Sequence, residues 1–124
     1  MTKTASQMGK AARNKGKVGE REVAHLLQKH GFSDSHRTQQ FSGKEGTADV
    51  VGLPGFHIEV KRQETYRIND WCQQAEDEAR QGETPIVVFR RSNQPWRVIM
   101  DFERFLSLMA EYQDVVEELD SIEK

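Results

Sequence analysis

The segment Phe56–Arg62 constrains the fold most, because its polar and apolar side chains alternate in the way typical of a half-buried β-strand. Successive side chains of a strand point to opposite faces. Ile58 and Val60 are therefore expected to enter a core, while Glu59 and Lys61 share the other face, about 6.6 Å apart. One surface would then carry an acid that can bind a metal and a cation that can bind a phosphate or a water.

Asp49 lies ten residues before Glu59 and can add a second carboxylate to this surface if the two segments form a hairpin. Directly opposed residues of a hairpin share a face, so the two acids meet only if residue 50 lies opposite residue 58. A plain two-residue turn at Pro54-Gly55 would aim Asp49 at the wrong face. We therefore expect an odd loop or a β-bulge at this turn, with Asp49 at a local distortion.

The chain has 124 residues, of which 35% are hydrophobic and 31% are charged, which indicates one globular domain with a modest core. It has no apolar run of the roughly 18 residues that a membrane span needs, and its basic N-terminus lacks the apolar stretch of a signal peptide. A cytoplasmic protein without a membrane partner is therefore expected.

The single cysteine, Cys72, cannot form an internal disulfide or a thiolate zinc site, and is expected to be a small, half-buried side chain. No Gly-rich phosphate loop is present, which argues against ATP hydrolysis.

Charge is distributed unevenly along the chain, although the net charge is only −2. Residues 1–21 contain six basic residues and one acid, whereas residues 111–124 contain six acids and one lysine. We expect a flexible basic arm at residues 1–16 that binds phosphates; the alternative is that it only aids solubility. We expect residues 113–124 to be an acidic, solvated helix end; the alternative is a segment that covers the basic face or binds a partner. A single folded domain would occupy residues 17–112.

Apolar periodicity and turn residues predict the order helix, three strands, helix, two strands, helix. The helices are expected at residues 17–30, 66–81 and from a cap at Asp101 onward, and the strands at residues 35–41, 47–52, 56–62, 85–89 and 96–100. This order predicts an α/β fold in which helices cover one central mixed sheet. The last helix carries an apolar stripe that serves either the core or a dimer contact, formed by Phe102, Phe105, Met109, Tyr112, Val116 and Leu119.

The acids suit the cleavage of a phosphodiester bond with the help of Mg²⁺. Mg²⁺ prefers hard oxygen ligands, and Asp49, Glu59 and the backbone carbonyl of Val60 can supply them. Glu20 lies on the buried stripe of the first helix and can complete the ligand set; the alternative is a first-turn acid that favours the helix dipole with its side chain turned outward. Lys61 is expected to orient or help deprotonate the attacking water.

The acids and the lysine belong to a longer ordered set: Gly16-x-x-Gly19-Glu20-Arg21-Glu22, Gly31-Phe32, Arg37, Ser42-Gly43, Asp49 and Glu59-Val60-Lys61. This set covers about residues 16–62 and resembles the PD-(D/E)XK nuclease superfamily, most closely the archaeal-type Holliday junction resolvases and their phage-encoded relatives. The resemblance implies a restriction-endonuclease-like core of the order αβββαβ, followed here by a C-terminal helix. It also implies a metal-dependent DNA endonuclease in which Glu20, Asp49 and Glu59 bind Mg²⁺, with Mn²⁺ able to substitute, and in which Lys61 is catalytic. Ala48 replaces the proline that names the superfamily, a change that its members commonly tolerate.

The expected substrate is branched DNA in the cytoplasm of a bacterium or of a phage-infected host, and a two-fold homodimer would supply the paired incisions that a four-way junction requires.

The resemblance places Arg37 and Ser42 close to the site, and either Gln73 or Gln74 would supply a glutamine found there in some relatives. His57 is expected to be a plain strand residue; the alternative is a phosphate contact. The residues expected to bind DNA are Lys10, Arg13, Lys15, Lys17, Arg37, Ser42, Lys44 and Arg62. Two rival functions are a nuclease of the same fold acting on linear, nicked or single-stranded DNA in repair or restriction, and a non-catalytic DNA-binding or assembly protein.

Overall fold

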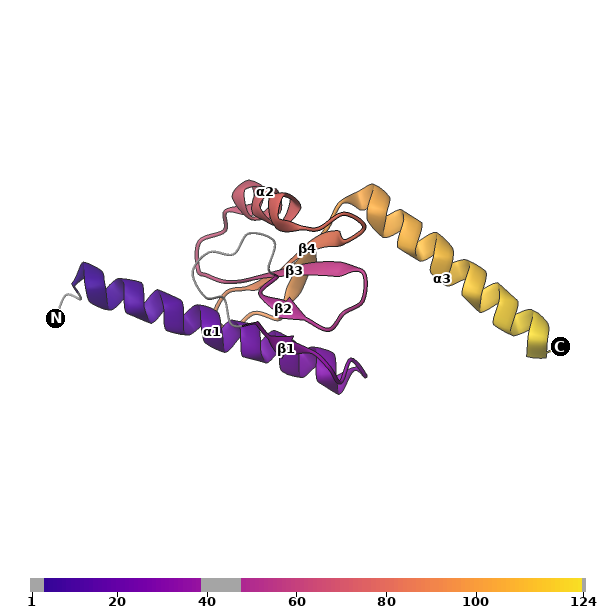
Figure 1. Ribbon diagram of the computed structural model, residues 1–124, viewed down its shortest axis with the longest axis horizontal. Coiled ribbons are helices and arrows are strands. Elements are labelled where there is room, and N and C mark those ends of the chain that lie inside the picture. Colours follow the sequence, from indigo (N-terminus) through magenta and orange to yellow (C-terminus); the bar gives the residue numbers. More distant parts are fainter. Residues whose placement is uncertain (1–3, 39–47, 124) are drawn as a thin grey trace.

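The computed structural model describes residues 4–38 and 48–123, and Figure 1 shows them as a sheet with three helices. The helices are α1 (Ala5–Lys29), α2 (Ile68–Glu78) and α3 (Phe102–Glu123). The strands are β1 (His36–Arg37), β2 (Val50–Val51), β3 (Phe56–Arg62), β4 (Thr84–Arg90) and β5 (Arg97–Ile99). The predicted order of elements and the α/β class are confirmed.

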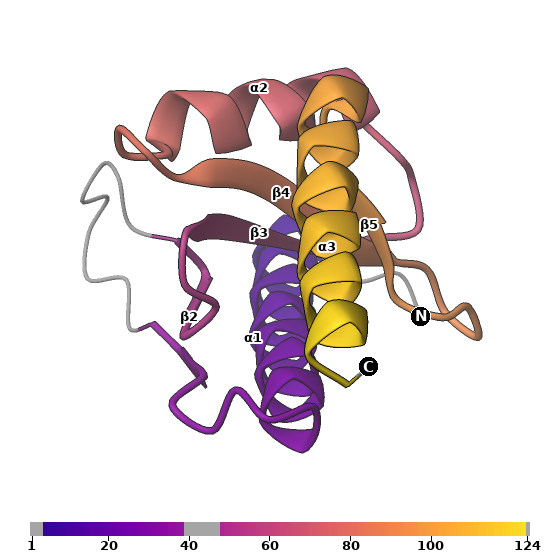
Figure 2. The ribbon, with the colours of Figure 1, turned by 90° about the vertical axis from the view of Figure 1, so that its right-hand side faces the viewer.

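The five strands form one mixed sheet in the order β1-β2-β3-β4-β5. Neighbouring strands are antiparallel except β3 and β4, which are parallel because the chain crosses over between them through α2. Helices α1 and α2 lie on opposite sides of the sheet (Figure 2). β3 is therefore the central strand, flanked by a strand on each side and by a helix on each face.

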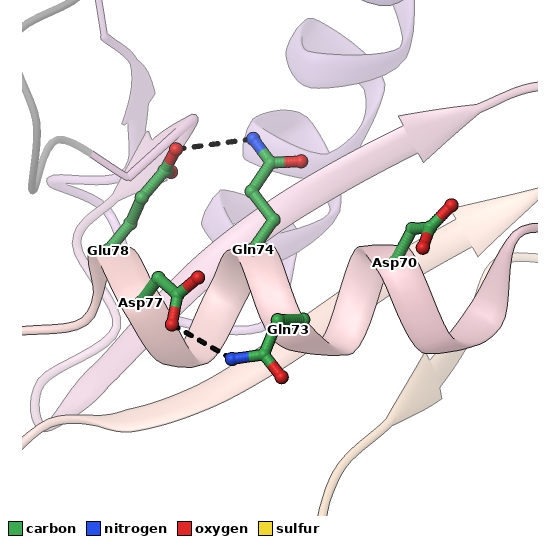
Figure 3. Close-up of a pocket in the computed structure, with 5 residues that line it drawn as sticks. All are labelled: Asp70, Gln73, Gln74, Asp77 and Glu78. Atoms are coloured by element: carbon green, nitrogen blue, oxygen red, sulfur yellow. Dashed lines mark hydrogen bonds between the residues drawn. The ribbon is translucent and has the colours of Figure 1, made fainter.

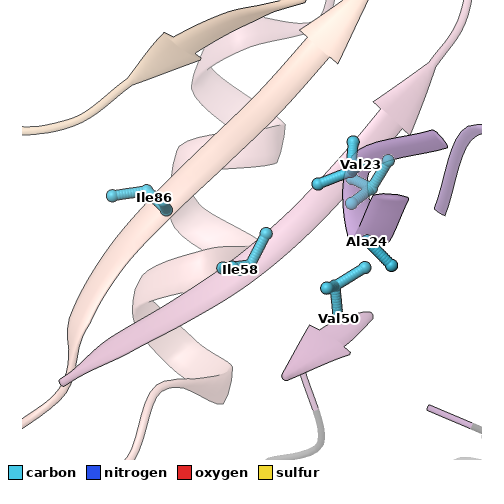
Figure 4. Packing of buried hydrophobic residues seen from close by; sticks show 6 residues of the cluster. Val23, Ala24, Val50, Ile58 and Ile86 are labelled. Carbon is cyan, nitrogen blue, oxygen red and sulfur yellow. The ribbon is translucent and has the colours of Figure 1, made fainter. Parts of the chain in front are cut away.

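Two apolar clusters lie on the two faces of the sheet. The cluster on the α1 face is formed by Val23, Ala24, Val50, Ile58, Val60 and Ile86 (Figure 4). The cluster on the α2 face is formed by Trp71, Ala75, Val87 and Phe89. The predicted alternation along β3 is confirmed, because Ile58 and Val60 lie in the first cluster while His57 and Glu59 are buried on the α2 face.

The register between β2 and β3 is the one that the two acids require, since Val50 lies opposite Ile58. Asp49 lies in a bend directly before β2, and its N–H donates to the carbonyl of Ile58 at 2.9 Å. The connection to β3 contains Gly52 with φ of 108° and Gly55 with φ of 82°. A Cβ at residue 52 would lie 2.4 Å from the Cα of Ser35, so the connection also depends on a close approach that only glycine permits.

Helix α1 lies unusually close to the sheet at Gly19. A Cβ at this position would lie 2.8 Å from the Cβ of Arg62 and 3.2 Å from the ring of Trp96. Three residues further along, Glu22 accepts hydrogen bonds from Trp96 Nε1 at 3.0 Å and from Arg90 Nε at 3.1 Å. The bare backbone at Gly19 and the contacts of Glu22 together fix the position of Glu20 between them.

The prediction that the first helix begins near Lys17 is wrong, because α1 already begins at Ala5. Thr4 caps the helix: its hydroxyl accepts from the N–H of Gln7 at 3.1 Å, and the Gln7 side chain accepts from the N–H of Thr4 at 2.9 Å. The sequence that follows is rich in alanine and lysine, which favour a helix despite two glycines. The basic arm as a DNA-binding segment, and the domain limits at residues 16 and 113, stay predictions.

Of the first predicted strand, residues 36 and 37 form β1. The predicted loop at 42–46, including Ser42 and Lys44, lies outside the described residues, as does Thr47. No helix among the described residues is long and apolar enough to cross a membrane. The last helix, α3, begins directly after Asp101 as predicted, but none of its residues is buried and it extends away from the sheet (Figure 1).

Candidate active site

A hollow of about 800 Å³ opens between the N-terminal half of α1 and the C-terminal end of β3. It is lined by the side chains or backbone of Glu20, Asp49, Val60 and Lys61, all predicted from the sequence to belong to the site. Lys15 and Arg62 line the same hollow, as do the exposed alanines of the first turns of α1. The structure therefore brings together candidate residues that come from three separate segments of the chain.

Asp49 and Glu20 face each other from the sheet edge and from the helix. Asp49 Oδ2 accepts a hydrogen bond from the N–H of Val60 at 2.8 Å, which holds this carboxylate beside β3. Glu20 accepts from Arg37 Nε at 3.1 Å, and its side chain is only 16% exposed. Burial raises the pKa of Glu20 and the charge of Asp49 raises it further, while Arg37 opposes both effects. Glu20 is therefore turned toward the other acid rather than outward as a simple helix-dipole residue.

Glu59 is fully buried at the middle of the central strand, one residue before Val60, whose backbone or side chain lines the hollow. A hydrogen bond of 2.7 Å joins its Oε1 to Nε2 of His57, which is also fully buried. Burial raises the pKa of Glu59 well above its usual range, and the neighbouring Glu78 and Asp49 add to this effect. Burial lowers the pKa of His57, against the pull of the negative charges of Glu83 and Glu78. Both shifts favour the uncharged forms of the two side chains. The alternative that His57 contacts a phosphate is wrong because its side chain is inaccessible.

Glu78, at the end of α2, completes this buried group. The pKa of Glu78 is lowered, first by its side-chain interaction with Glu59 and also by the hydrogen bond that Gln74 donates to it. Glu59 Oε2 has no N–H or O–H donor among the described residues, which agrees with Glu59 itself carrying the proton. One ligand atom from each of His57, Glu59 and Glu78 lies within 4.8 Å of the others.

Sequence reasoning missed Glu78. Its spacing of four residues from Gln74 on one helix was the available signal.

Lys61 is held by one of the two candidate glutamines. Its Nζ donates to Gln74 Oε1 at 2.6 Å, and Gln74 Nε2 donates in turn to Glu78 Oε1 at 3.3 Å. Gln73 instead donates to Asp77 on the exposed side of α2, at 2.9 Å. Figure 3 shows the pairs Gln74–Glu78 and Gln73–Asp77 pointing in different directions from α2, along a pocket that these side chains line. The choice that the sequence left open is therefore decided in favour of Gln74.

Of the predicted DNA contacts, Lys15 and Arg62 line the hollow, whereas Lys10, Arg13 and Lys17 do not. Lys10, Arg13, Lys15 and Lys17 are exposed along the first half of α1. Arg62 is partly buried and donates to Ser92 Oγ at 2.9 Å and to Glu64 at 3.3 Å. Arg37 is engaged with Glu20, and Ser42 and Lys44 lie outside the described residues.

The donor set suits a hard divalent cation. Glu20 and Asp49 line the hollow together with Val60, and Asp49 also interacts with the buried Glu59, which has an oxygen that accepts from no donor among the residues described. Clustered carboxylates with raised proton affinity are an arrangement that a bound metal ion relieves.

Comparisons with known proteins identify the family of the chain and a solved structure of similar fold. The family model described as "Phage putative PDDEXK endonuclease" matches residues 11–122. Among solved structures, the chain is similar to Hjc of Archaeoglobus fulgidus, a Holliday junction resolvase from an archaeal hyperthermophile. The two share 26% sequence identity with a TM-score of 0.55, over 68% of this chain and 76% of that chain. No curated protein matches the chain significantly. Since the family match spans nearly the whole chain, the resemblance seen in the sequence is confirmed, and the chain belongs to the phage PD-(D/E)XK endonuclease family.

Proposed function

We propose that this endonuclease is a Mg²⁺-dependent enzyme that cuts branched DNA as a two-fold dimer, in the cytoplasm of a bacterial or phage-infected cell. The observation that carries the proposal is the hollow that Glu20, Asp49 and Lys61 line together with the basic residues Lys15 and Arg62.

Asp49, Glu59 and the carbonyl of Val60 would hold the metal ion, and Glu20 would complete the ligand set. When bound, Mg²⁺ supplies a Lewis acid that activates a water and neutralises charge on the scissile phosphate. Arg37 limits the repulsion between Glu20 and Asp49, so that both acids can stay close before an ion arrives. The neutral pair of Glu59 and His57 avoids the cost of burying an isolated charge in the metal-free protein.

Lys61 would orient the attacking water and offset negative charge in the transition state. Gln74 fixes the direction of the ammonium group through its 2.6 Å hydrogen bond, and it leaves the other ammonium protons free to face a phosphate. A positioned cation of this kind acts where charge develops and needs no reorganisation during the reaction.

The basic first half of α1 would bind the phosphates on either side of the cleaved bond. Its four cationic side chains, Lys10, Arg13, Lys15 and Lys17, are exposed. Each phosphate that they neutralise releases counterions, so binding would weaken steeply with salt.

The branched substrate is proposed from the similarity to Hjc, which is a Holliday junction resolvase. A four-way junction has two-fold symmetry, and a dimer with two identical sites can place one paired cut on each side of it. The alternatives are a nuclease that acts on linear, nicked or single-stranded DNA and a DNA-binding protein without activity.

The deciding experiment compares a synthetic four-way junction, its linear duplex arms and a single strand, each end-labelled, in Mg²⁺, Mn²⁺ or chelator. The wild-type chain is set against Lys61→Ala and against Lys29→Ala, which removes the same charge from the exposed far end of α1. Paired cuts confined to the junction that need both metal and Lys61 would support the proposal. Cutting of all three substrates would refute the branch preference, and binding without cutting in any metal would refute the enzyme.

A further inference from the structure

Helix α3 has no partner that covers its apolar side chains. It runs for 22 residues, about 33 Å at 1.5 Å per residue, and none of them is buried. It makes no extensive contact with another described element, and Figure 1 shows it extending away from the sheet. Its exposed large apolar residues are Phe102, Phe105, Leu106, Met109, Tyr112, Val115, Leu119 and Ile122. A surface of this size on a soluble domain marks an interaction site.

The apolar residues of α3 follow the repeat of a coiled coil. Steps of three and four residues alternate along a seam formed by Phe102, Phe105, Met109, Tyr112, Val116 and Leu119. A second row repeats every seven residues beside this seam and is formed by Leu108, Val115 and Ile122. Side chains at such spacing interdigitate with those of a facing helix and favour helix pairing over packing against a flat sheet.

The charges of α3 indicate which partner fits. The acids Glu103, Glu111, Asp114, Glu117 and Glu118 fall at heptad positions that face away from the seam. Asp120 flanks the seam and Glu123 reaches it only at the last residue of the helix. Two copies of α3 can therefore meet along the apolar seam without opposing their negative charges.

The same charges argue against two other occupants of the seam. A helix that lies on a membrane surface typically has a basic polar face, whereas that of α3 is acidic with Arg104 as its one basic residue. A nucleic acid would be repelled by the same acids.

We infer that α3 is a dimerisation helix that pairs with α3 of a second copy of this chain. The base of the helix is tied to the sheet, because Arg104 Nε donates to Thr84 Oγ1 at 2.7 Å. Thr84 begins β4, which pairs in parallel with β3, so a pair of α3 helices is connected to the strand that carries Glu59. The inference supplies the contact for the dimer in the proposed function, but it is tested without DNA, so that either can fail while the other stands.

The experiment measures the mass of the full-length protein by sedimentation over a wide concentration range, for the wild type and three variants. Met109→Glu places a charge in the seam. Ser107→Glu adds the same charge two residues earlier, on the acidic outer face, and is the matched control. Val98→Glu tests the edge strand β5, where Val98 is 57% exposed and could offer a rival contact. Circular dichroism and thermal melting of each variant report whether the domain is folded, and folding is expected because none of the three residues is buried.

We expect a wild-type dimer, a dimer constant weakened more than about 100-fold by Met109→Glu, and little change in Ser107→Glu or Val98→Glu. A wild-type chain that is monomeric throughout would overturn the inference. So would a dimer that survives Met109→Glu, or one that Val98→Glu breaks.

Discussion

Two glycines of α1, three residues apart, allow the same chemical change to be tested in open space and in a tight contact. A Cβ at Gly16 would meet nothing within 4 Å. Gly16→Ala should therefore stabilise the fold by about 0.5–1 kcal/mol, because alanine loses less backbone entropy in a helix. A Cβ at Gly19 would lie 2.8 Å from the Cβ of Arg62, which is the fixed base of that side chain and not its flexible end.

Gly19→Ala gains the same stabilisation from the helix preference of alanine, but the overpacked contact with Arg62 lowers the free energy of unfolding by about 1–3 kcal/mol. The free energies of unfolding of the two variants should therefore differ by about 1–3 kcal/mol, with Gly19→Ala the less stable, or roughly 3–12 °C in Tm for a domain of this size. Urea denaturation of both variants measures this difference directly, provided that the m-values agree. Equal stabilities, or a more stable Gly19→Ala, would refute the view that the close packing of Gly19 against Arg62 positions α1 on the sheet.

Three further predictions concern the chemistry of the site. Gln74→Ala should lower the cleavage rate in single-turnover assays by about 10-fold or more, because it frees the Lys61 ammonium, whereas the control Gln73→Ala should leave the rate unchanged. Equal losses in the two variants would contradict the role of Gln74 in holding Lys61. Burial raises the pKa of Glu59, so in the metal-free protein its contribution to stability is fully present below its unfolded pKa and is lost as pH rises toward the folded pKa. Mg²⁺ competes with this proton, so the gain in Tm on adding Mg²⁺ should be larger near pH 8 than near pH 6, and a gain that falls with pH would argue against Glu59 as a ligand. The double variant Lys10→Ala/Arg13→Ala should reduce the salt dependence of DNA binding by up to about 2 in the log–log slope, and an unchanged slope would remove the first turns of α1 from the DNA contact.

Most of the strands could be predicted because their signal is local. The alternation along β3 assigns each face, and the requirement that Asp49 share a face with Glu59 selects one register, which the structure has at Val50 and Ile58. Helix α1 was placed too late because residues 1–16 contain almost no large apolar residues and so show no apolar stripe, whereas the capping box at Thr4 and the alanines and lysines after it favour a helix without one.

The inner contacts of the site could not be predicted in the same way, because they join α2 to β3 across a distance in sequence. Glu78 meets Glu59 and His57 only after the crossover packs; its spacing from Gln74 indicates that these two side chains can pair on one helix, but not that Glu78 reaches β3. The choice between the glutamines did have a local signal. Trp71 and Ala75 mark the buried stripe of α2, and Gln74 lies three residues after Trp71 and next to that stripe.

In the central strand, the N–H of Val60 donates its hydrogen bond to a side-chain oxygen, Asp49 Oδ2, and not to a backbone carbonyl of β2. β2 pairs with β3 only at Ile58, so the amide of Val60 is protected by the carboxylate itself. Amide hydrogen exchange at this one residue thus reports on Asp49. Asp49→Ala would leave the amide unprotected and loosen the strand end, whereas Asp49→Asn keeps an acceptor oxygen, which makes the asparagine variant the better inactive form for trapping a DNA complex.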